Sequence, residues 1–401
     1  MNAGGTRIGS LFTGYSGLDS AVIDALGGGR TMWHSDIKPA SVALLEHHHP
    51  DVPNLGDMTA IDYASVEPID VLAASWPCQS FSSAGKRLGE ADPRALWPHV
   101  ARAVEATRPK VFFGENVARI TSVGELRRAV TSLAALGYVG AWRVLGAADV
   151  GACHLRKRCF VLAVDAASAD AQDLRDTYLP DGSYSQAFPI GAVAGSGAGG
   201  GSGRAAQGVR ELGRAPGIVD VRPGGGEVHA ATGQLSLLPT PTQSMTTGAG
   251  TSGRDGGMNL QTAVACPPTP SVADSRNTRN ATARRSEGQG HHHSGWTLCD
   301  VAHADTWGKY GPAIARHEQA LGRSAPAPTA GATKAGNPLL NPAFVEFMMM
   351  LPEGHVTGVP GLTRSQQLSL LGDGVVPAQG AAAFSFLLDH LAQRFASEAA
   401  A

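Results

Sequence analysis

The sequence predicts an α/β fold in which a mostly parallel sheet carries helices on both faces. First, short apolar runs alternate with helix-like stretches from residue 7 to about 165. Second, hydrophobic residues make up 43% of the 401 residues, enough for a large buried core. Third, apolar residues at helical spacing return near the C-terminus. The alternation of apolar runs with helix-like stretches is typical of parallel sheets, which bind ligands at the C-terminal ends of their strands.

Each expected strand is a short apolar run, and helix-like stretches separate these runs. The expected strands are 7–12, 31–36, 69–76, 110–117 and 158–164, and the expected helices are 18–26, 39–48, 95–108 and 125–136. Further on, 341–352 has apolar residues at helical spacing. The stretch 368–395 predicts a turn followed by a long helix that starts after Pro377.

The chain between these ordered parts has a different composition. There are 51 Gly and 25 Pro but only 6% aromatic residues, so long irregular segments must accompany the core. Residues 191–226 are rich in glycine, and we expect them to form a flexible linker. The sequence therefore divides into a sheet domain (1–165), an insertion (166–335) and a C-terminal segment (336–401) that returns to the sheet.

Charge and cysteine content narrow the class of protein. The net charge of −2 gives no global sign of a nucleic-acid partner, although a local basic face would suffice. No run approaches the roughly 20 apolar residues that span a bilayer, and the N-terminus lacks the apolar stretch of a signal peptide. The cysteines form no CxxC pair, which argues against a disulfide framework and a four-cysteine zinc site; they are Cys78, Cys153, Cys159, Cys266 and Cys299. We expect a soluble protein of a reducing compartment, with no metal and no membrane partner.

A glycine-containing turn in "SLFTGYSGLDSAV" (10–22) is the first candidate site. The spacing Gly14-x-x-Gly17 lets the backbone approach a ligand, but ordinary strand-to-helix turns share it, and it is too short for the three-glycine dinucleotide fingerprint. Asp36 and Asp57 follow at strand ends. There an acid can bind ribose hydroxyls or accept from a base amino group, although strand-end acids are also ordinary helix caps.

Cys78 lies just past the expected strand 69–76, at the C-terminal edge of the sheet. Most lone cysteines are buried and inert, but Pro77 and the Gly-containing loop that follows favour an exposed nucleophilic thiol. The loop 80–97 could close over a substrate. Glu115 ends the next apolar strand, so the two side chains should share one cleft as a catalytic pair.

Arg156 and Arg158 are two residues apart at the start of an expected strand, so they should point the same way. Two guanidinium groups on one face can bind a phosphate or the polar edge of a substrate. A metal site made of Cys153, His154 and Cys159 matches no standard zinc spacing.

Taken in order, these pieces resemble the DNA (cytosine-5)-methyltransferase family, in the form found in actinobacteria and their phages. "SLFTGYSGLD" is similar to the first cofactor motif, "PCQSFS" (77–82) to the nucleophile motif and "ENV" (115–117) to the glutamate motif. "HLRKR" (154–158) is similar to the Gln-x-Arg-x-Arg motif, and "GDGVVPAQ" (372–379) to the last motif, Gly-Asn-x-Val. The resemblance covers about 1–165 and 340–390. It implies a Rossmann-like S-adenosylmethionine-dependent methyltransferase sheet with an irregular target-recognition insertion.

The resemblance also implies a role for each matching position. The catalytic residues would be Cys78, Glu115, Arg156 and Arg158. The S-adenosylmethionine site would be formed by Phe12, Gly14, Gly17, Asp36, Asp57, Pro77, Leu96, Asp373 and Val375. We expect double-stranded DNA as the partner, with contacts from the loop after Cys78 and from the polar, basic stretch 274–285: Gln79, Ser82, Lys86, Arg87, Arg276 and Arg279.

The implied activity is methyl transfer to C5 of a cytosine flipped out of duplex DNA at a specific short sequence. It would proceed through a covalent bond between Cys78 and C6, as part of DNA modification in a restriction-modification system. We expect a monomer in the cytoplasm of a bacterial or phage-infected cell.

Three positions depart from the family pattern. Trp76 replaces the first proline of Pro-Pro-Cys, His154 replaces the glutamine, and Asp373 replaces the asparagine. Asp373 adds a negative charge near the expected cofactor pocket.

Other functions remain open at this point. A tRNA cytosine-5 methyltransferase shares the motifs, although the long insertion disfavours it. A catalytically inactive DNA-binding relative is disfavoured by the intact Cys78, Glu115, Arg156 and Arg158. A nicotinamide-dependent oxidoreductase is disfavoured because the Gly-x-Gly-x-x-Gly fingerprint is missing.

Overall fold

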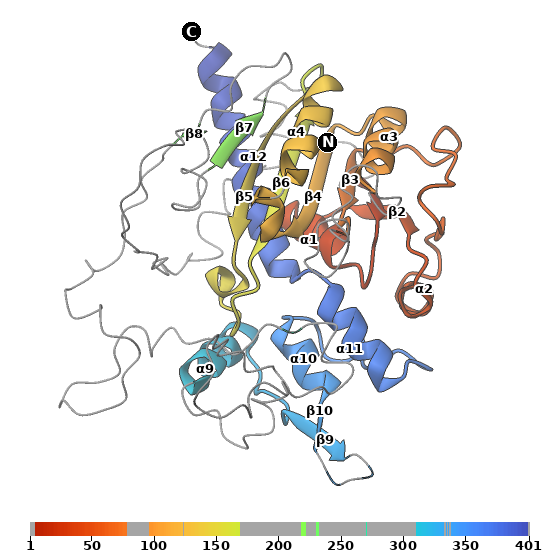
Figure 1. The fold of residues 1–401 in the computed structure, drawn as a ribbon, viewed down its shortest axis with the longest axis vertical. Helices are drawn as coiled ribbons and strands as arrows, with labels where there is room; N and C mark the ends of the chain where they lie inside the picture. Colours follow the sequence, from red (N-terminus) through yellow and green to blue (C-terminus); the bar gives the residue numbers. More distant parts are fainter. Residues whose placement is uncertain are drawn as a thin grey trace, which may run out of the picture.

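One sheet of eight strands organises the protein, in the order β2-β1-β3-β4-β6-β5-β7-β8 (Figure 1). This is a computed structural model, and it describes residues 5–77, 96–122, 124–168, 218–221, 230–231, 270, 310–332, 334, 336 and 338–399.

The first four strands of the sheet are parallel. β2 (Arg30–Ser35), β1 (Arg7–Leu11), β3 (Val71–Ala74) and β4 (Val111–Val117) pair in this order. Parallel neighbours need crossover connections, so their C-terminal ends all meet at one edge of the sheet. The connections contain α1 (Gly17–Ala25), α2 (Pro39–His48) and α3 (Trp97–Thr107). The expected strands and helices of this half are all present, with ends that differ by at most two residues.

The other half of the sheet is antiparallel, so the expectation of a mostly parallel sheet holds only for the first four strands. β6 (Arg158–Asp165) runs antiparallel to β4, and β5 (Tyr138–Leu145) lies antiparallel beside β6. Strand β5 was not predicted, because Gly140 and Arg143 interrupt its apolar pattern. Gly140 is required there, since a Cβ would lie 2.7 Å from the carbonyl oxygen of Leu162.

Helices cover both faces of the sheet, as predicted. On one face, α1 and the long α12 (Pro377–Ala399) bury a core that includes Phe113, Phe160 and Phe384. On the other face, α3 and α4 (Glu125–Ala135) bury a core that includes Trp97 of α3 and Phe112 of β4. α12 begins at the predicted Pro377, whose fixed φ suits the first position of a helix.

A smaller group of C-terminal elements lies beyond one end of the sheet (Figure 1). It has its own buried cluster, which includes Phe344, Phe347 and Leu371 and is completed by Leu44 of α2. The expected helix at 341–352 is present but shorter, and the helix at 364–373 was not predicted. The elements are α9 (Gly311–Leu321), β9 (Thr329–Ala332), β10 (Pro338–Leu340), α10 (Pro342–Met348) and α11 (Arg364–Asp373).

The insertion is described only in part. Within the segment expected to be a flexible linker, 191–226, Ile218–Val221 form strand β7, which pairs with β5 and with β8 (Ala230–Ala231). The β-branched "IVDV" favours a strand despite its glycine-rich surroundings. The proposed domain boundaries stay predictions.

One helical stretch of the described residues, 364–397, is long and apolar enough to cross a membrane by length and composition alone. It comprises α11 and α12, and most of its apolar part is buried inside the protein. α12 packs on α1 and on the sheet, as expected for a core helix.

Candidate active site

The turn after β1 is the first part of the candidate site. Phe12, Gly14 and Ser16 all have positive φ, at 55°, 60° and 67°, so the backbone is tightly curled. The N–H groups of Phe12 and Thr13 donate to the carbonyl of Ser35 at the end of β2. These bonds stabilise a turn in which Phe12 and Ser16 have positive φ, a conformation that non-glycine residues rarely adopt.

Two carboxylates follow the turn at successive strand ends. Asp36 is half-buried and accepts the N–H groups of Gly14 at 2.9 Å and Lys38 at 2.8 Å. Asp57 is exposed, and the backbone N–H and hydroxyl of Thr59 both donate to its Oδ1. These two hydrogen bonds lower the pKa of Asp57, so it is ionised at neutral pH. Each carboxylate has further lone pairs with which to accept from a ligand.

The C-terminal segment forms the wall behind this turn. The Tyr15 hydroxyl donates to the carbonyl of Val375 at 2.7 Å. A Cβ on Gly17 would lie 2.5 Å from that same carbonyl oxygen, and a Cβ on Gly374 would overlap the Tyr15 ring. The glycine at position 17 is therefore needed for close packing between α1 and the 374–375 backbone. Val375 is buried.

The ends of β3 and β4 form the second part of the site. Ala74 pairs with Gly114, so residues 75–77 lie beside Glu115 and Asn116. The Asn116 amide donates to the carbonyl of Trp76 at 2.8 Å, which fixes the chain immediately before Pro77. Pro77 and Leu96 are partly buried, and Leu96 occupies the position before the first residue of α3.

Glu115 is buried and forms an ion pair with Arg158. Arg158 Nε lies 2.9 Å from Glu115 Oε1, and the side chains are 16% and 8% exposed. Arg158 begins β6 opposite Val117, which places the pair on the face covered by α1 and α12. Burial raises the pKa of Glu115, while the charges of Arg158 and Arg156 act in the opposite direction.

Arg156 does not share a strand face with Arg158, so this expectation was wrong. It precedes β6 and has φ 25°, and its guanidinium is buried among backbone carbonyls. It donates to the carbonyls of Pro270 and Gly372, both at 2.9 Å, and to that of Gly374. Burial lowers its pKa to about 9, which leaves it charged at neutral pH.

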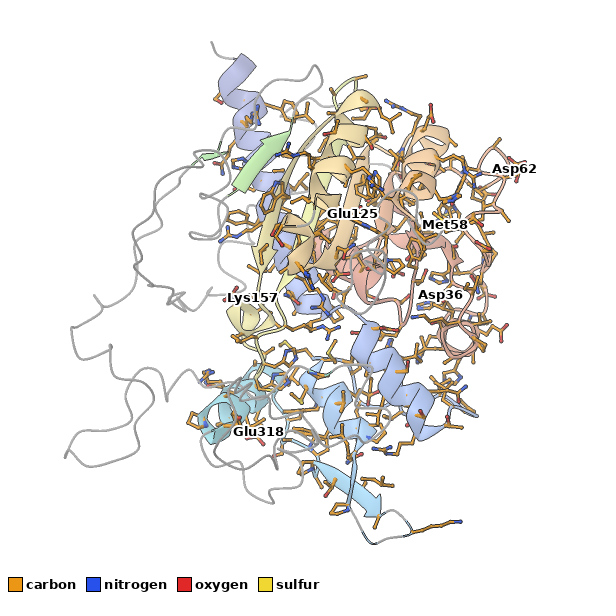
Figure 2. All side chains as sticks on the ribbon, in the orientation of Figure 1. Asp36, Met58, Asp62, Glu125, Lys157 and Glu318 are labelled. Atoms are coloured by element: carbon orange, nitrogen blue, oxygen red, sulfur yellow. The ribbon has the colours of Figure 1, made fainter. Side chains whose placement is uncertain are left out.

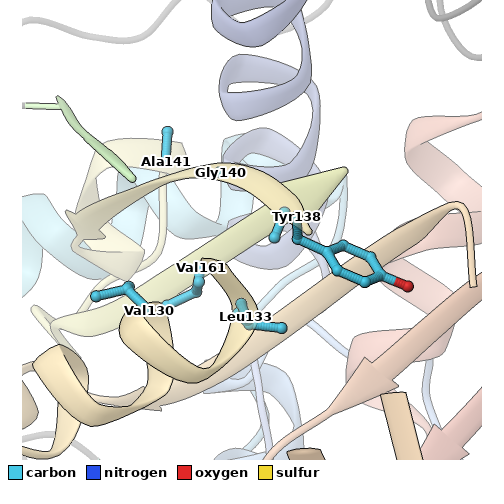
Figure 3. Close-up of a pocket in the computed structure, with 7 residues that line it drawn as sticks. Val130, Leu133, Tyr138, Gly140, Ala141 and Val161 are labelled. Carbon is cyan, nitrogen blue, oxygen red and sulfur yellow. The ribbon is translucent and has the colours of Figure 1, made fainter. Parts of the chain in front are cut away.

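The candidate site lies at one end of the sheet. Asp36 and Lys157 are both at the end that faces the C-terminal helices (Figure 2). A small apolar pocket elsewhere, between α4 and the strands β5 and β6, is lined by Val130, Leu133 and Val161 among others (Figure 3). It offers no charged group and is not a candidate for catalysis. No group of three or more possible metal ligands occurs among the described residues.

Comparison with known proteins identifies the family. The profile of the C-5 cytosine-specific DNA methylase family matches residues 6–187. The Type II methyltransferase M.AquIA of Picosynechococcus sp. is 34% identical over 174 residues, which cover 38% of this chain and 69% of that protein. The chain belongs to the C-5 cytosine-specific DNA methylase family.

Other relatives match a smaller part of their length. The Type II methyltransferase M.NlaIV of Neisseria lactamica is 37% identical over 166 residues, which cover 38% of this chain and 39% of that protein. The chain thus aligns with about two fifths of this relative. The S. pombe Dnmt2 methyltransferase is 13% identical, with a TM-score of 0.49, 96% of this chain and 99% of that chain covered. That structural similarity is too weak to bear on function.

The structure accounts for the three departures from the family pattern. Trp76 is buried against Trp97, with ring centroids 4.9 Å apart, in a space that a Cβ on Gly114 would fill. His154 is buried and hydrogen-bonds the carbonyl of Met348 at 2.9 Å, a bond that the family's glutamine could also donate. Asp373 pairs with Lys38 at 2.5 Å, so the charge it adds is balanced.

Two structurally important residues of the family motifs were not singled out from the sequence. Asn116 aligns β4 with the chain before Cys78. Gln379 donates to the carbonyls of Leu145 and Arg156 at 2.8 and 2.9 Å, and so fixes the turn that carries the arginines. Asn116 lies in the motif "ENV" and Gln379 in "GDGVVPAQ", so their positions in these motifs could have marked them as important.

Several predicted site residues lie outside the described residues. They include the nucleophile and all six expected DNA contacts: Cys78, Gln79, Ser82, Lys86, Arg87, Arg276 and Arg279. Their roles stay predictions.

Proposed function

We propose that this methylase transfers a methyl group from S-adenosylmethionine to C5 of cytosine in double-stranded DNA. The observation that carries the proposal is the buried Glu115–Arg158 pair, which lies beside the end of the strand that leads to Cys78. Family membership supplies the reaction class. The Type II methyltransferases among the relatives support a role in restriction-modification.

The turn after β1 fits S-adenosylmethionine. No heavy atom lies within 4 Å of the position that a Cβ on Gly14 would occupy, so this side of the turn has room for a ligand. Asp36 would accept the ribose hydroxyls, and ionised Asp57 would accept the adenine amino group. Phe12, Gly17, Pro77, Leu96, Asp373 and Val375 would complete the site. When bound, the cofactor supplies an electrophilic methyl group.

Cys78 would act as the nucleophile. Its thiolate would form a bond to C6 of cytosine, and the electron pair of the C5–C6 double bond would move toward C5. C5 then becomes nucleophilic enough to take up a methyl group. Loss of the C5 proton to a base and of the thiolate from C6 would restore the aromatic ring and free the cysteine.

Glu115 would stabilise the ring during this attack. Burial raises its pKa and so favours the protonated carboxyl, which can donate a proton to N3 as negative charge develops. Arg158 would hold the carboxyl in place through its ion pair. Arg156 would support the site through the backbone of residues 372–374.

DNA is expected to approach the edge of the sheet at which these groups lie. Among the described residues, Lys157 and Arg119 are exposed cations near the Glu115 strand end and suit phosphate contacts. Because C6 is inaccessible within a duplex, the target cytosine would be flipped out. The chain that follows Cys78, up to the start of α3 at Trp97, would close over it. The insertion 166–335 would read the sequence. We infer a monomeric cytoplasmic enzyme of a bacterial or phage-infected cell.

A direct assay tests this proposal. Purified protein is incubated with methyl-labelled S-adenosylmethionine and either genomic duplex DNA or tRNA, and the modified nucleosides are identified by mass spectrometry. We expect 5-methylcytosine in DNA. Label in tRNA alone would favour the tRNA methyltransferase, whereas binding of DNA without any transfer would favour the inactive relative.

A further inference from the structure

The cofactor turn is also held by a histidine from the C-terminal segment. His355 Nε2 lies 2.9 Å from the carbonyl oxygen of Tyr15, which is 340 residues away in the sequence. A carbonyl can only accept, so His355 must carry the proton on Nε2. Tyr15 stands between Gly14 and Ser16, both with positive φ. The bond therefore acts on the most curled part of the turn.

His48 holds His355 in turn. It is the last residue of α2, and its Nε2 lies 2.7 Å from the carbonyl oxygen of His355. The two imidazole rings are stacked, with centroids 4.7 Å apart and an interplanar angle of 9°. We refer to His48 and His355 together as the histidine latch.

The loop that carries His355 is fixed by a buried carboxylate. Glu346 is 1% exposed and accepts four hydrogen bonds, from the backbone N–H groups of Gly354, Val356 and Thr357 and from the Thr357 hydroxyl. These donors lie on both sides of His355. Its position is therefore set before any ligand binds, which is the condition for a preorganised contact.

We propose that His48 and His355 are positioning residues that hold the cofactor turn in its binding conformation through the carbonyl of Tyr15. This proposal rests on the proposed function, because it assigns the latch to S-adenosylmethionine binding. Neither histidine belongs to the catalytic set. Their contribution should appear in cofactor affinity and leave the chemical step unchanged.

The latch is also expected to respond to pH. Burial lowers the pKa of His355, and the adjacent His48 lowers it further. The hydrogen bond to the Tyr15 carbonyl and the charges of Glu346 and Asp19 act in the opposite direction, but the net pKa is lowered. His49, next along α2, faces the same cluster, and its own pKa is lowered by burial. A proton gained by His355 would place a positive charge in a largely buried site against the stacked ring of His48. The latch should thus be intact above the ordinary histidine pKa and weaken as pH falls.

Two substitutions of His355 distinguish the effect of its hydrogen bond to Tyr15 from the effect of its charge. His355→Leu removes the donor, and His355→Gln keeps an amide donor that does not titrate. Dissociation constants for S-adenosylmethionine are measured by calorimetry from pH 5.5 to 8.5, and kcat is measured with saturating cofactor. We expect His355→Leu to weaken binding about tenfold at pH 8, the loss of one hydrogen bond, with little change in kcat. His355→Gln should bind like the wild type at pH 8 and lose less affinity at pH 5.5.

Glu46 provides the control, since Glu46→Gln changes an exposed position of the same helix, α2, outside the latch. It should leave both affinity and its pH dependence unchanged. Wild-type affinity in His355→Leu at every pH, or an acid-induced loss in His355→Gln equal to that of the wild type, would overturn the latch. If His355→Leu does not fold, the His355→Gln comparison still decides. Absence of cofactor binding by the wild type would instead refute the proposed function.

Discussion

Arg158 Nε contacts Glu115 Oε1 at 2.9 Å in a buried position at the end of β4. Burial raises the pKa of the carboxyl, although the arginine opposes the shift. The pair thus combines an oriented carboxyl with a burial that favours its protonated form. This combination suits a group that must donate to a ring nitrogen at the moment of attack.

Glu115→Gln should therefore lower kcat by roughly 10²–10⁴-fold, with little effect on cofactor affinity. If Glu115 donates a proton, wild-type kcat should fall as pH rises through its raised pKa, and the glutamine variant should lack this limb. Steady-state methylation over a pH series provides the measurement. Glu105→Gln, at an exposed position of α3, is the matched control. Near-normal kcat in Glu115→Gln would exclude the assigned role.

Arg156→Met should destabilise the fold. The substitution removes a buried guanidinium and leaves the carbonyls of Pro270, Gly372 and Gly374 without that donor, at a cost of about 3–5 kcal/mol. Urea denaturation gives the free energy of unfolding. Lys157→Met, at the exposed neighbouring position, should change it by less than about 0.5 kcal/mol. Equal effects of the two substitutions would contradict the buried role of Arg156.

The sequence was most informative where the chain alternates simply between strand and helix. From β1 to β4, each apolar run became a strand, because the buried strands of a parallel sheet need uninterrupted hydrophobic residues. β5 escaped detection since Arg143 lies within it. Its guanidinium sits 4.0 Å from the centroid of the Phe386 ring, a partner from α12 that no local pattern reveals.

In the candidate site, too, local patterns predicted well and contacts between distant residues were missed. The motifs located Glu115 and Arg158 correctly at one edge, because neighbouring strand ends must meet. The two-residue spacing wrongly placed Arg156 on one strand face with Arg158, because its positive φ and carbonyl partners depend on residues more than 100 positions away. The roles of Trp76 and Asp373 also required tertiary contacts, with Trp97 and Lys38 respectively.

His154 should make the free energy of unfolding decrease as pH falls below 6.5. Burial lowers its pKa to about 3 in the folded protein, against 6.5 ordinarily. Between pH 6.5 and 3 the imidazole of His154 takes up a proton in the unfolded chain but not in the folded protein. Its contribution to the free energy of unfolding is therefore complete above pH 6.5 and is lost as pH falls toward 3. At pH 5 the loss from this group is about 2 kcal/mol. His154→Gln should remove that part of the loss between pH 7.5 and 5 in urea denaturation, and an unchanged pH dependence would contradict it.

Gly14→Ala and Gly17→Ala should differ in their effects. At Gly14 the space is open, so only the positive φ opposes a Cβ, by about 1–2 kcal/mol. At Gly17 a Cβ would meet the Val375 carbonyl at 2.5 Å and force the turn and the C-terminal segment apart. We expect Gly17→Ala to bind the cofactor at least about tenfold more weakly than Gly14→Ala, which corresponds to about 1.4 kcal/mol. Calorimetric titration compares them, and equal affinities would argue against this close packing.

The central claim, that Cys78 attacks C6 beside Glu115, can be tested most directly by trapping. Bisulfite sequencing of DNA from expressing cells first gives the recognition site, and a duplex is then made with 5-fluorocytosine at the target. After methyl transfer, C5 of this base carries no proton to lose, so the thiol cannot leave C6. Mass spectrometry should detect a covalent protein–DNA adduct at Cys78 in the wild type and none in Cys78→Ser. An adduct in Cys78→Ser, or methylation of normal cytosine by that variant, would contradict the mechanism.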